Sequence, residues 1–130
     1  PFDLEQTTHI FTKTEKGGIQ QVIVKESADA GQIRLIRAHL LKISREFMHG
    51  NFSDAAKIHG ENMPGLAELR KAKPGLIRID YRELDTGAQI DYSTDDPGLV
   101  NAIHRWFDAQ LSDHARHAVP GPDRHPPQSP

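Results

Sequence analysis

The chain has 130 residues, a formal net charge of −2 and no cysteine. This length fits one domain, and the charge argues against a dedicated nucleic-acid-binding protein, which usually carries a basic face. The absence of cysteine excludes disulfides, thiolate metal sites and cysteine nucleophiles. No apolar run approaches the roughly 20 residues of a membrane helix, so we expect no membrane span. The eight histidines are the unusual feature of the composition, because histidine is the commonest metal ligand.

The N-terminal part predicts a hairpin followed by a helix. Residues 7–14 (TTHIFTKT) and 19–25 (IQQVIVK) are rich in β-branched residues, with a glycine-containing turn between them. Asp29 is placed to cap a helix, with Gln32 completing a capping box, and Gly50 is placed to end it. The apolar stripe of this helix follows at spacings of three and four residues: Ile33, Ile36, Leu40, Ile43 and Phe47.

A polar connector, residues 51–75, separates this unit from a second one. Ser53 can cap a single helical turn, and Pro64 suits the first turn of a short helix over residues 64–71. The connector also carries His59 and Met63. Function concentrates on irregular segments that a rigid scaffold holds in place, so we expect a site here.

The second unit repeats the pattern of the first. Residues 76–84 predict a half-buried strand, and Ala88, Ile90 and Tyr92 face inward on the return strand. Asp96 then caps a helix that is predicted to run to about His117. Its apolar stripe contains Val100, Ile103, Phe107 and Leu111. Residues 119–130 are rich in proline and predict a non-helical tail.

The two units match at an offset of 67 residues, which relates Asp29 to Asp96 and Ile23 to Ile90. We therefore predict an α+β fold in which duplicated ββα units form a four-stranded antiparallel sheet with helices packed on one face. Residues 1–118 would form the domain, with units over 7–50 and 76–118.

The first hairpin differs from the second because both of its faces carry apolar residues. Ile10 and Ile23 lie on one face, which we assign to the core. Phe11, Val22 and Val24 lie on the other, with His9 beside them. A second subunit, the tail or a ligand could cover this second face. We predict a homodimer through the first hairpin, since dimers are the commonest assembly.

Histidine and methionine offer the clearest chemistry in the sequence. His59 and Met63 are four residues apart and would share one face of a helix. Imidazole with a thioether suits copper, and His39 or His114 could supply a third ligand. A structural role at the edge of a helix stripe is the alternative for His39. No nucleophile elbow or phosphate-binding glycine motif occurs, so we do not expect an enzyme.

Three strings, PFDLEQTTHIFTKTEKGG, IHGENMPGL and HRWFDAQLSDH, resemble a group of small exported bacterial proteins that are often labelled aspartate carbamoyltransferase. The resemblance implies a periplasmic or secreted protein with a signal peptide before Pro1, and no established activity. Genuine transcarbamoylases are much longer, with two α/β domains and a Ser-Thr-Arg-Thr phosphate loop that this chain lacks. We expect a metal-binding or small-ligand-binding domain, copper being the first guess. The alternative is a dimeric interaction module without a ligand.

Overall fold

Two antiparallel hairpins form the centre of one sheet. β1 (Thr7–Thr14) pairs with β2 (Gly17–Val24), and β3 (Arg78–Leu84) pairs with β4 (Gly87–Ser93). β2 and β4 are antiparallel neighbours, so the hairpins join side by side. A short strand, β5 (Ala118–Pro120), lies parallel to β1 at the edge, which gives the order β3-β4-β2-β1-β5.

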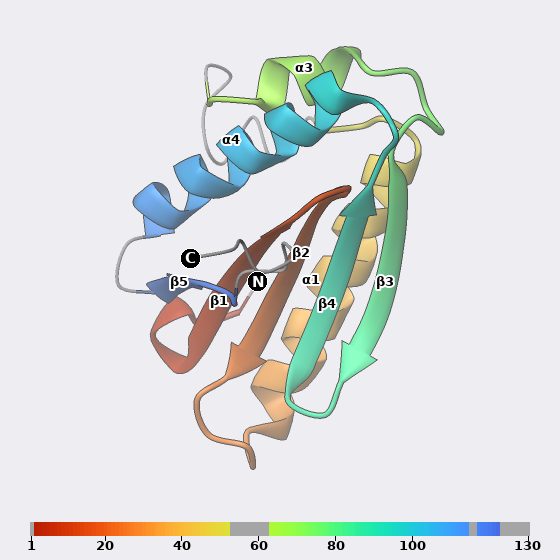
Figure 1. Cartoon of the computed structure of the whole chain (residues 1–130). Helices are drawn as coiled ribbons and strands as arrows, with labels where there is room; N and C mark the ends of the chain where they lie inside the picture. Colours follow the sequence, from red (N-terminus) through yellow and green to blue (C-terminus); the bar gives the residue numbers. More distant parts are fainter. Residues whose placement is uncertain (1, 53–62, 115–116, 123–130) are drawn as a thin grey trace.

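The computed structural model describes residues 2–52, 63–114 and 117–122 (Figure 1). The α+β class is confirmed, but the predicted four-stranded antiparallel sheet is a five-stranded mixed sheet. The fifth strand includes residues 119 and 120, which we had assigned to the tail. The turn predicted after Ser53 lies outside the described residues.

Three helices accompany the sheet in the described part of the chain: α1 (Ala30–Met48), α3 (Leu66–Lys71) and α4 (Pro97–His114). α1 packs mainly on β3 and β4 and also contacts β2, whereas α4 packs on β1, β2 and β5, so each long helix mainly covers the hairpin of the other unit (Figure 1). α3 packs against α4. No helix among the described residues has the length and apolar character needed to cross a membrane.

Both long helices begin where the sequence predicts. The Asp29 side chain accepts a hydrogen bond from the backbone N–H of Gln32. The Asp96 Oδ1 atom accepts one from the N–H of Gly98 at 2.8 Å, and Pro97 opens α4. Such caps each contribute about 1 kcal/mol. α4 is described as far as His114, and residues 115 and 116, which precede the predicted end near His117, lie outside the described residues.

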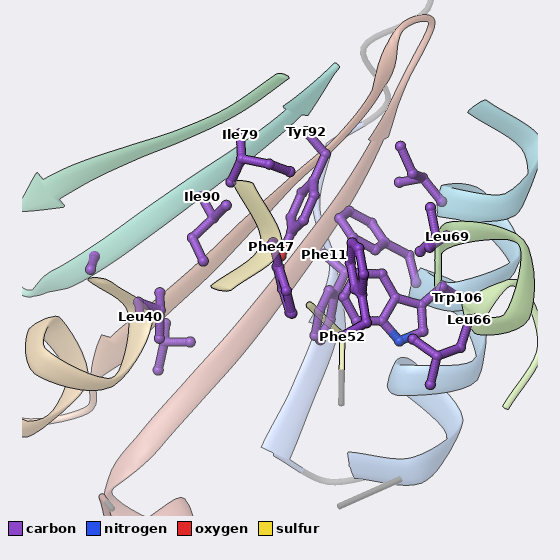
Figure 2. Packing of buried hydrophobic residues seen from close by; sticks show 14 of the residues in the cluster. Phe11, Leu40, Phe47, Phe52, Leu66, Leu69, Ile79, Ile90, Tyr92 and Trp106 are labelled. Atoms are coloured by element: carbon purple, nitrogen blue, oxygen red, sulfur yellow. The ribbon is translucent and has the colours of Figure 1, made fainter. Parts of the chain in front are cut away.

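The helices cover the opposite face of the first hairpin from the one we expected. Phe11, Val22 and Val24 are 2%, 0% and 5% exposed, and all three belong to the hydrophobic core. Figure 2 shows Phe11 among these core side chains. Ile10 and Ile23 lie on the other face and are only partly buried. The bare face of our dimer prediction is therefore covered by the chain itself. Strand alternation groups residues by face but does not determine which face a helix will cover.

Aromatic side chains fill one end of the core. Trp106 lies edge-on to Phe47, Phe52 and Tyr92, with ring centroids 5.8, 6.2 and 5.8 Å away (Figure 2). These rings come from α4, α1, the segment after α1, and β4. Each fully buried large apolar side chain stabilises the fold by about 1.5–3 kcal/mol, so this contact layer holds α1 and α4 in place on the sheet.

Candidate functional site

The other end of the core holds histidines. His9 on β1 contacts both Phe2 and His114 on α4, and Phe2 also contacts His39 on α1. We call the side chains of His9, His39 and His114 the histidine cluster. The rings of His9 and His114 are stacked, with centroids 4.5 Å apart and planes 16° apart. The Phe2 ring lies 5.7 Å from His9 and 5.6 Å from His39. Three elements that are distant in sequence therefore bring their imidazoles to one region.

Local structure explains why each imidazole faces inward. Thr7, His9 and Phe11 alternate onto the inner face of β1, and His9 is 5% exposed. His114 follows the buried Phe107 by seven residues, two helical turns, and so stays on the inner side of α4. His39 precedes the buried Leu40 at the edge of the α1 stripe and is partly buried.

The orientation of the stacked His9 and His114 rings prevents both from binding one metal ion in this arrangement. A metal bound to imidazole lies in the plane of the ring, about 2.0–2.1 Å from the nitrogen in the case of zinc. Because the His9 and His114 planes are nearly parallel and lie face to face, they share no in-plane position close to both nitrogens. Accordingly, no group of three His, Asp or Glu side chains among residues 2–52, 63–114 and 117–122 is arranged to hold a metal ion.

Two of the four predicted ligands are linked only indirectly, through Phe2 and His9. His39 and His114 both belong to the histidine cluster. Met63 is 8% exposed in the hydrophobic core, where its backbone carbonyl accepts a hydrogen bond from Leu66. It lies just before Gly65, which packs against Ala102 and Trp106. His114 lies about 12 Å along α4 from Trp106 at 1.5 Å per residue. His59 lies outside the described residues.

Sequence reasoning did not assign His9 and Phe2 to the site. The strand pattern placed His9 on the same face as Phe11, but we took that face to be an intermolecular surface. Once Phe11 is recognised as a core residue, the same alternation makes His9 a core histidine. Phe2 lies in a lead-in segment without periodicity, so no sequence signal placed it.

Two other histidines have structural roles. The Nε2–H of His104 donates to the carbonyl oxygen of Thr14 at 2.7 Å, which ties α4 to the end of β1. The Nδ1 atom of His49 lies 2.8 Å from the carbonyl oxygen of Arg45 in the last turn of α1. Both therefore serve as comparison positions for the histidine cluster.

A hollow lies at the C-terminal end of α1. It is lined by Phe47, Phe52, Leu69 and Pro74, among others, and its volume of about 210 Å³ includes space open to solvent. Pockets for drug-sized ligands usually measure about 300–1,000 Å³. The histidine cluster offers more specific chemistry than this hollow.

Comparison with protein-family models, curated proteins and solved structures gives no match to this chain. We therefore infer a function from the geometry of the residues themselves.

Proposed function

We propose that the chain is an exported domain that binds a transition-metal ion through the histidine cluster, with copper as the first candidate. The supporting observation is a chain of ring contacts that links three imidazoles from β1, α1 and α4: His39 contacts Phe2, Phe2 contacts His9, and His9 stacks on His114. Imidazole suits copper, zinc, iron and nickel, and copper(II) binds most tightly among the divalent ions. Export follows from the resemblance of the sequence to small exported bacterial proteins.

We further propose that the two ββα halves derive from one ancestral unit. Gly17 and Gly87 each begin the second strand of a hairpin, so the strands correspond at an offset of 70. Under this offset Gln20 and Ile90 are equivalent, and they pair directly with each other, as an approximate twofold axis between β2 and β4 requires. The helices correspond at the offset of 67. The earlier equivalence of Ile23 with Ile90 is wrong, because Ile90 faces the core and Ile23 does not.

Because of this correspondence, each position of the histidine cluster can be compared with its equivalent in the other half of the chain. The three cluster positions match three apolar core residues of the opposite end: His9 matches Ile79, His39 matches Trp106, and His114 matches Phe47. At that end these positions are used for packing. At the histidine end they carry imidazoles, which pack less favourably than apolar side chains because buried polar groups lose hydration. Ligand binding accounts for this substitution of apolar side chains by imidazoles.

Metal binding requires a local change in the cluster. At least one ring of the stacked pair must rotate so that its nitrogen points to the same position as the nitrogen of the other. His114 is suited to this rotation, because it is partly buried and lies in the last turn of α4. A side chain can move between staggered rotamers without moving the backbone. The stacked arrangement is thus the metal-free state in this proposal.

The test is calorimetric titration of copper(II) and zinc(II) into protein purified without a histidine tag. We expect one tight site in the wild type, weakened at least about tenfold, or roughly 1.4 kcal/mol, in His9→Phe, His39→Phe and His114→Phe. His49→Gln is the matched control, because His49 is exposed and lies outside the cluster. His59→Ala measures the predicted contribution of the connector. Equal affinity in the wild type and all three cluster variants would exclude this site.

A second candidate function, homodimerisation, is favoured by the sheet face that the described helices leave uncovered. Ile10 and Ile19 are partly buried there, and Val119 beside Ile10 is 44% exposed. The outward side chains of β1 and β2 carry no charge: Thr8, Ile10, Thr12, Thr14, Ile19, Gln21 and Ile23. Such a neutral face can pack against a second copy of itself, as in sheet-on-sheet packing. Ile10→Lys should then shift sedimentation from dimer to monomer, whereas a monomeric wild type would exclude this candidate.

A further inference from the structure

The free edge of β3 is a surface that can accept a partner strand. The strand order β3-β4-β2-β1-β5 gives β3 one neighbouring strand, β4 (Figure 1). Apart from β4, no described segment of the chain hydrogen-bonds to the backbone of residues 79–83. An edge strand presents unpaired N–H and C=O groups that can pair with another strand. β3 therefore has the backbone groups needed to extend the sheet.

The register of the sheet determines which residues of β3 present these free groups. The N–H of Val24 donates to the carbonyl oxygen of Thr86, and the N–H of Thr94 donates to that of Lys16, both at 2.9 Å. These bonds continue the β2–β4 ladder, so the even-numbered residues of β4 bond to β2. Because bond directions alternate along a strand, the odd-numbered residues of β4 bond to the even-numbered residues of β3. The backbone groups that point to the free edge are those of Ile79, Tyr81 and Glu83.

We propose that β3 pairs with β3 of a second copy of the chain, antiparallel and around a twofold axis at Tyr81. Tyr81 then faces Tyr81 of the partner subunit, and Ile79 faces Glu83 of the partner subunit, in hydrogen-bonded pairs. Between these pairs, Asp80 lies opposite Arg82 of the partner subunit on both sides of the axis. In such non-hydrogen-bonded pairs the side chains are closest, and opposite charges stabilise the pairing.

The charge pattern of β3 favours this register over its neighbours. Asp80 and Arg82 are exposed, and neither has an ion-pair or hydrogen-bond partner in the described part of the chain. A shift of two residues in one direction sets Asp80 opposite Asp80 of the partner subunit. A shift in the other direction sets Arg82 opposite Arg82 of the partner subunit. Like charges directly opposite destabilise pairing, so charges that would usually protect an edge strand here select one antiparallel register.

The helix above β3 is compatible with this pairing. α1 packs mainly on β3 and β4, so the two copies of α1 would lie about two strand spacings apart, roughly 10 Å, close to the usual distance between packed helices. His39 lies on the side of α1 that contacts Phe2. At 3.6 residues per turn, Leu41 and Met48 lie on the opposite side, nearest the free edge. Leu41 is half-buried and Met48 is 43% exposed, and the second helix would cover both.

A charge-exchange experiment followed by sedimentation at low ionic strength tests this contact. Asp80→Arg and Arg82→Asp each set like charges opposite one another in a homodimer, so the dimer Kd of each variant should rise at least about tenfold over the wild type. An equimolar mixture of the two variants restores both pairs of opposite charges and should form a heterodimer. The double variant Asp80→Arg/Arg82→Asp should dimerise like the wild type. Glu15→Arg is the matched control, since Glu15 is exposed in the β1–β2 turn, and thermal denaturation establishes that each variant is folded.

Amide exchange provides a second readout that is specific to the edge. The N–H groups of Ile79, Tyr81 and Glu83 should exchange more slowly at high than at low protein concentration. Those of Asp80 and Arg82, which bond to β4, should be protected at both concentrations.

The contact is independent of metal binding and uses a different surface from the outer face of β1 and β2. A wild type that stays monomeric, or a mixture of Asp80→Arg and Arg82→Asp that does not associate, would overturn it. So would a dimer that is lost in Ile10→Lys and kept in Asp80→Arg, because that dimer would use the outer face instead.

Discussion

The hydrogen bond between Tyr92 and Gln20 should contribute measurably to folding, because both side chains are buried at the junction of the two hairpins. The Tyr92 hydroxyl donates to the Gln20 Oε1 atom at 2.6 Å. Tyr92→Phe keeps the ring but leaves the Gln20 oxygen in the core without this donor. Leaving a buried polar group unsatisfied costs about 1–3 kcal/mol, so we expect the free energy of unfolding to fall by about that amount.

Urea denaturation of the wild type, Tyr92→Phe, Gln20→Met and the double variant measures this contribution. The double variant should lose less stability than the sum of the single variants, with a coupling of at least about 0.5–1 kcal/mol. Burial also raises the pKa of the Tyr92 hydroxyl. The raised pKa means that only the unfolded state ionises above the ordinary tyrosine value of about 10. The wild type should therefore lose stability above about pH 10 more steeply than Tyr92→Phe. Equal urea midpoints for the wild type and Tyr92→Phe at neutral pH would refute this reasoning.

Three further predictions concern the faces of the sheet, the α3–α4 contact and a surface carboxylate. Val22→Lys should unfold the protein or lower its stability by more than about 4 kcal/mol, because it buries an unpaired charge. Ile23→Lys, on the outer face, should lower stability by only about 1 kcal/mol. Similar melting temperatures for the two variants would show that the two faces of the sheet are misassigned. Gly65 has φ +81°, and an added Cβ would clash with the carbonyl of Ala102. Gly65→Ala should therefore lower the free energy of unfolding by roughly 3 kcal/mol in chemical denaturation. An unchanged denaturation midpoint would count against the contact between Gly65 and α4. The hydrogen bond from Lys16 lowers the pKa of Asp95, and Lys16→Ala should raise that pKa toward its ordinary range in an NMR pH titration, whereas an unchanged value would mean that the pair is not formed in solution.

Local sequence signals predicted the hairpins and the helix starts because these features depend on neighbouring residues. Asp29 and Asp96 cap their helices through hydrogen bonds within three residues of the cap. The inward positions of Ile90 and Tyr92 follow from alternation on a strand with only one apolar face. These elements needed no knowledge of long-range packing.

Long-range packing determined what the sequence could not predict. The first hairpin has apolar residues on both faces, and its core face was decided by α4, which follows it by more than seventy residues and packs Phe107 against Phe11. β5 is only three residues long and contains proline, so its pairing with β1 carries no local signal. The histidine cluster was predicted in part from local sequence and depends in part on long-range packing. Helix spacing identified His39 and His114 as candidates, but only tertiary structure places them near His9 and Phe2.

The most direct test of the metal site is a zinc(II) titration followed by long-range proton–nitrogen correlation spectra of the imidazole rings. The proposed site predicts that ring nitrogens of His9, His39 and His114 shift together and stop shifting at one equivalent of zinc(II), whereas His49 and His104 keep their positions. Shifts confined to histidines outside the cluster, or cluster signals that do not change as zinc(II) is added, would contradict it.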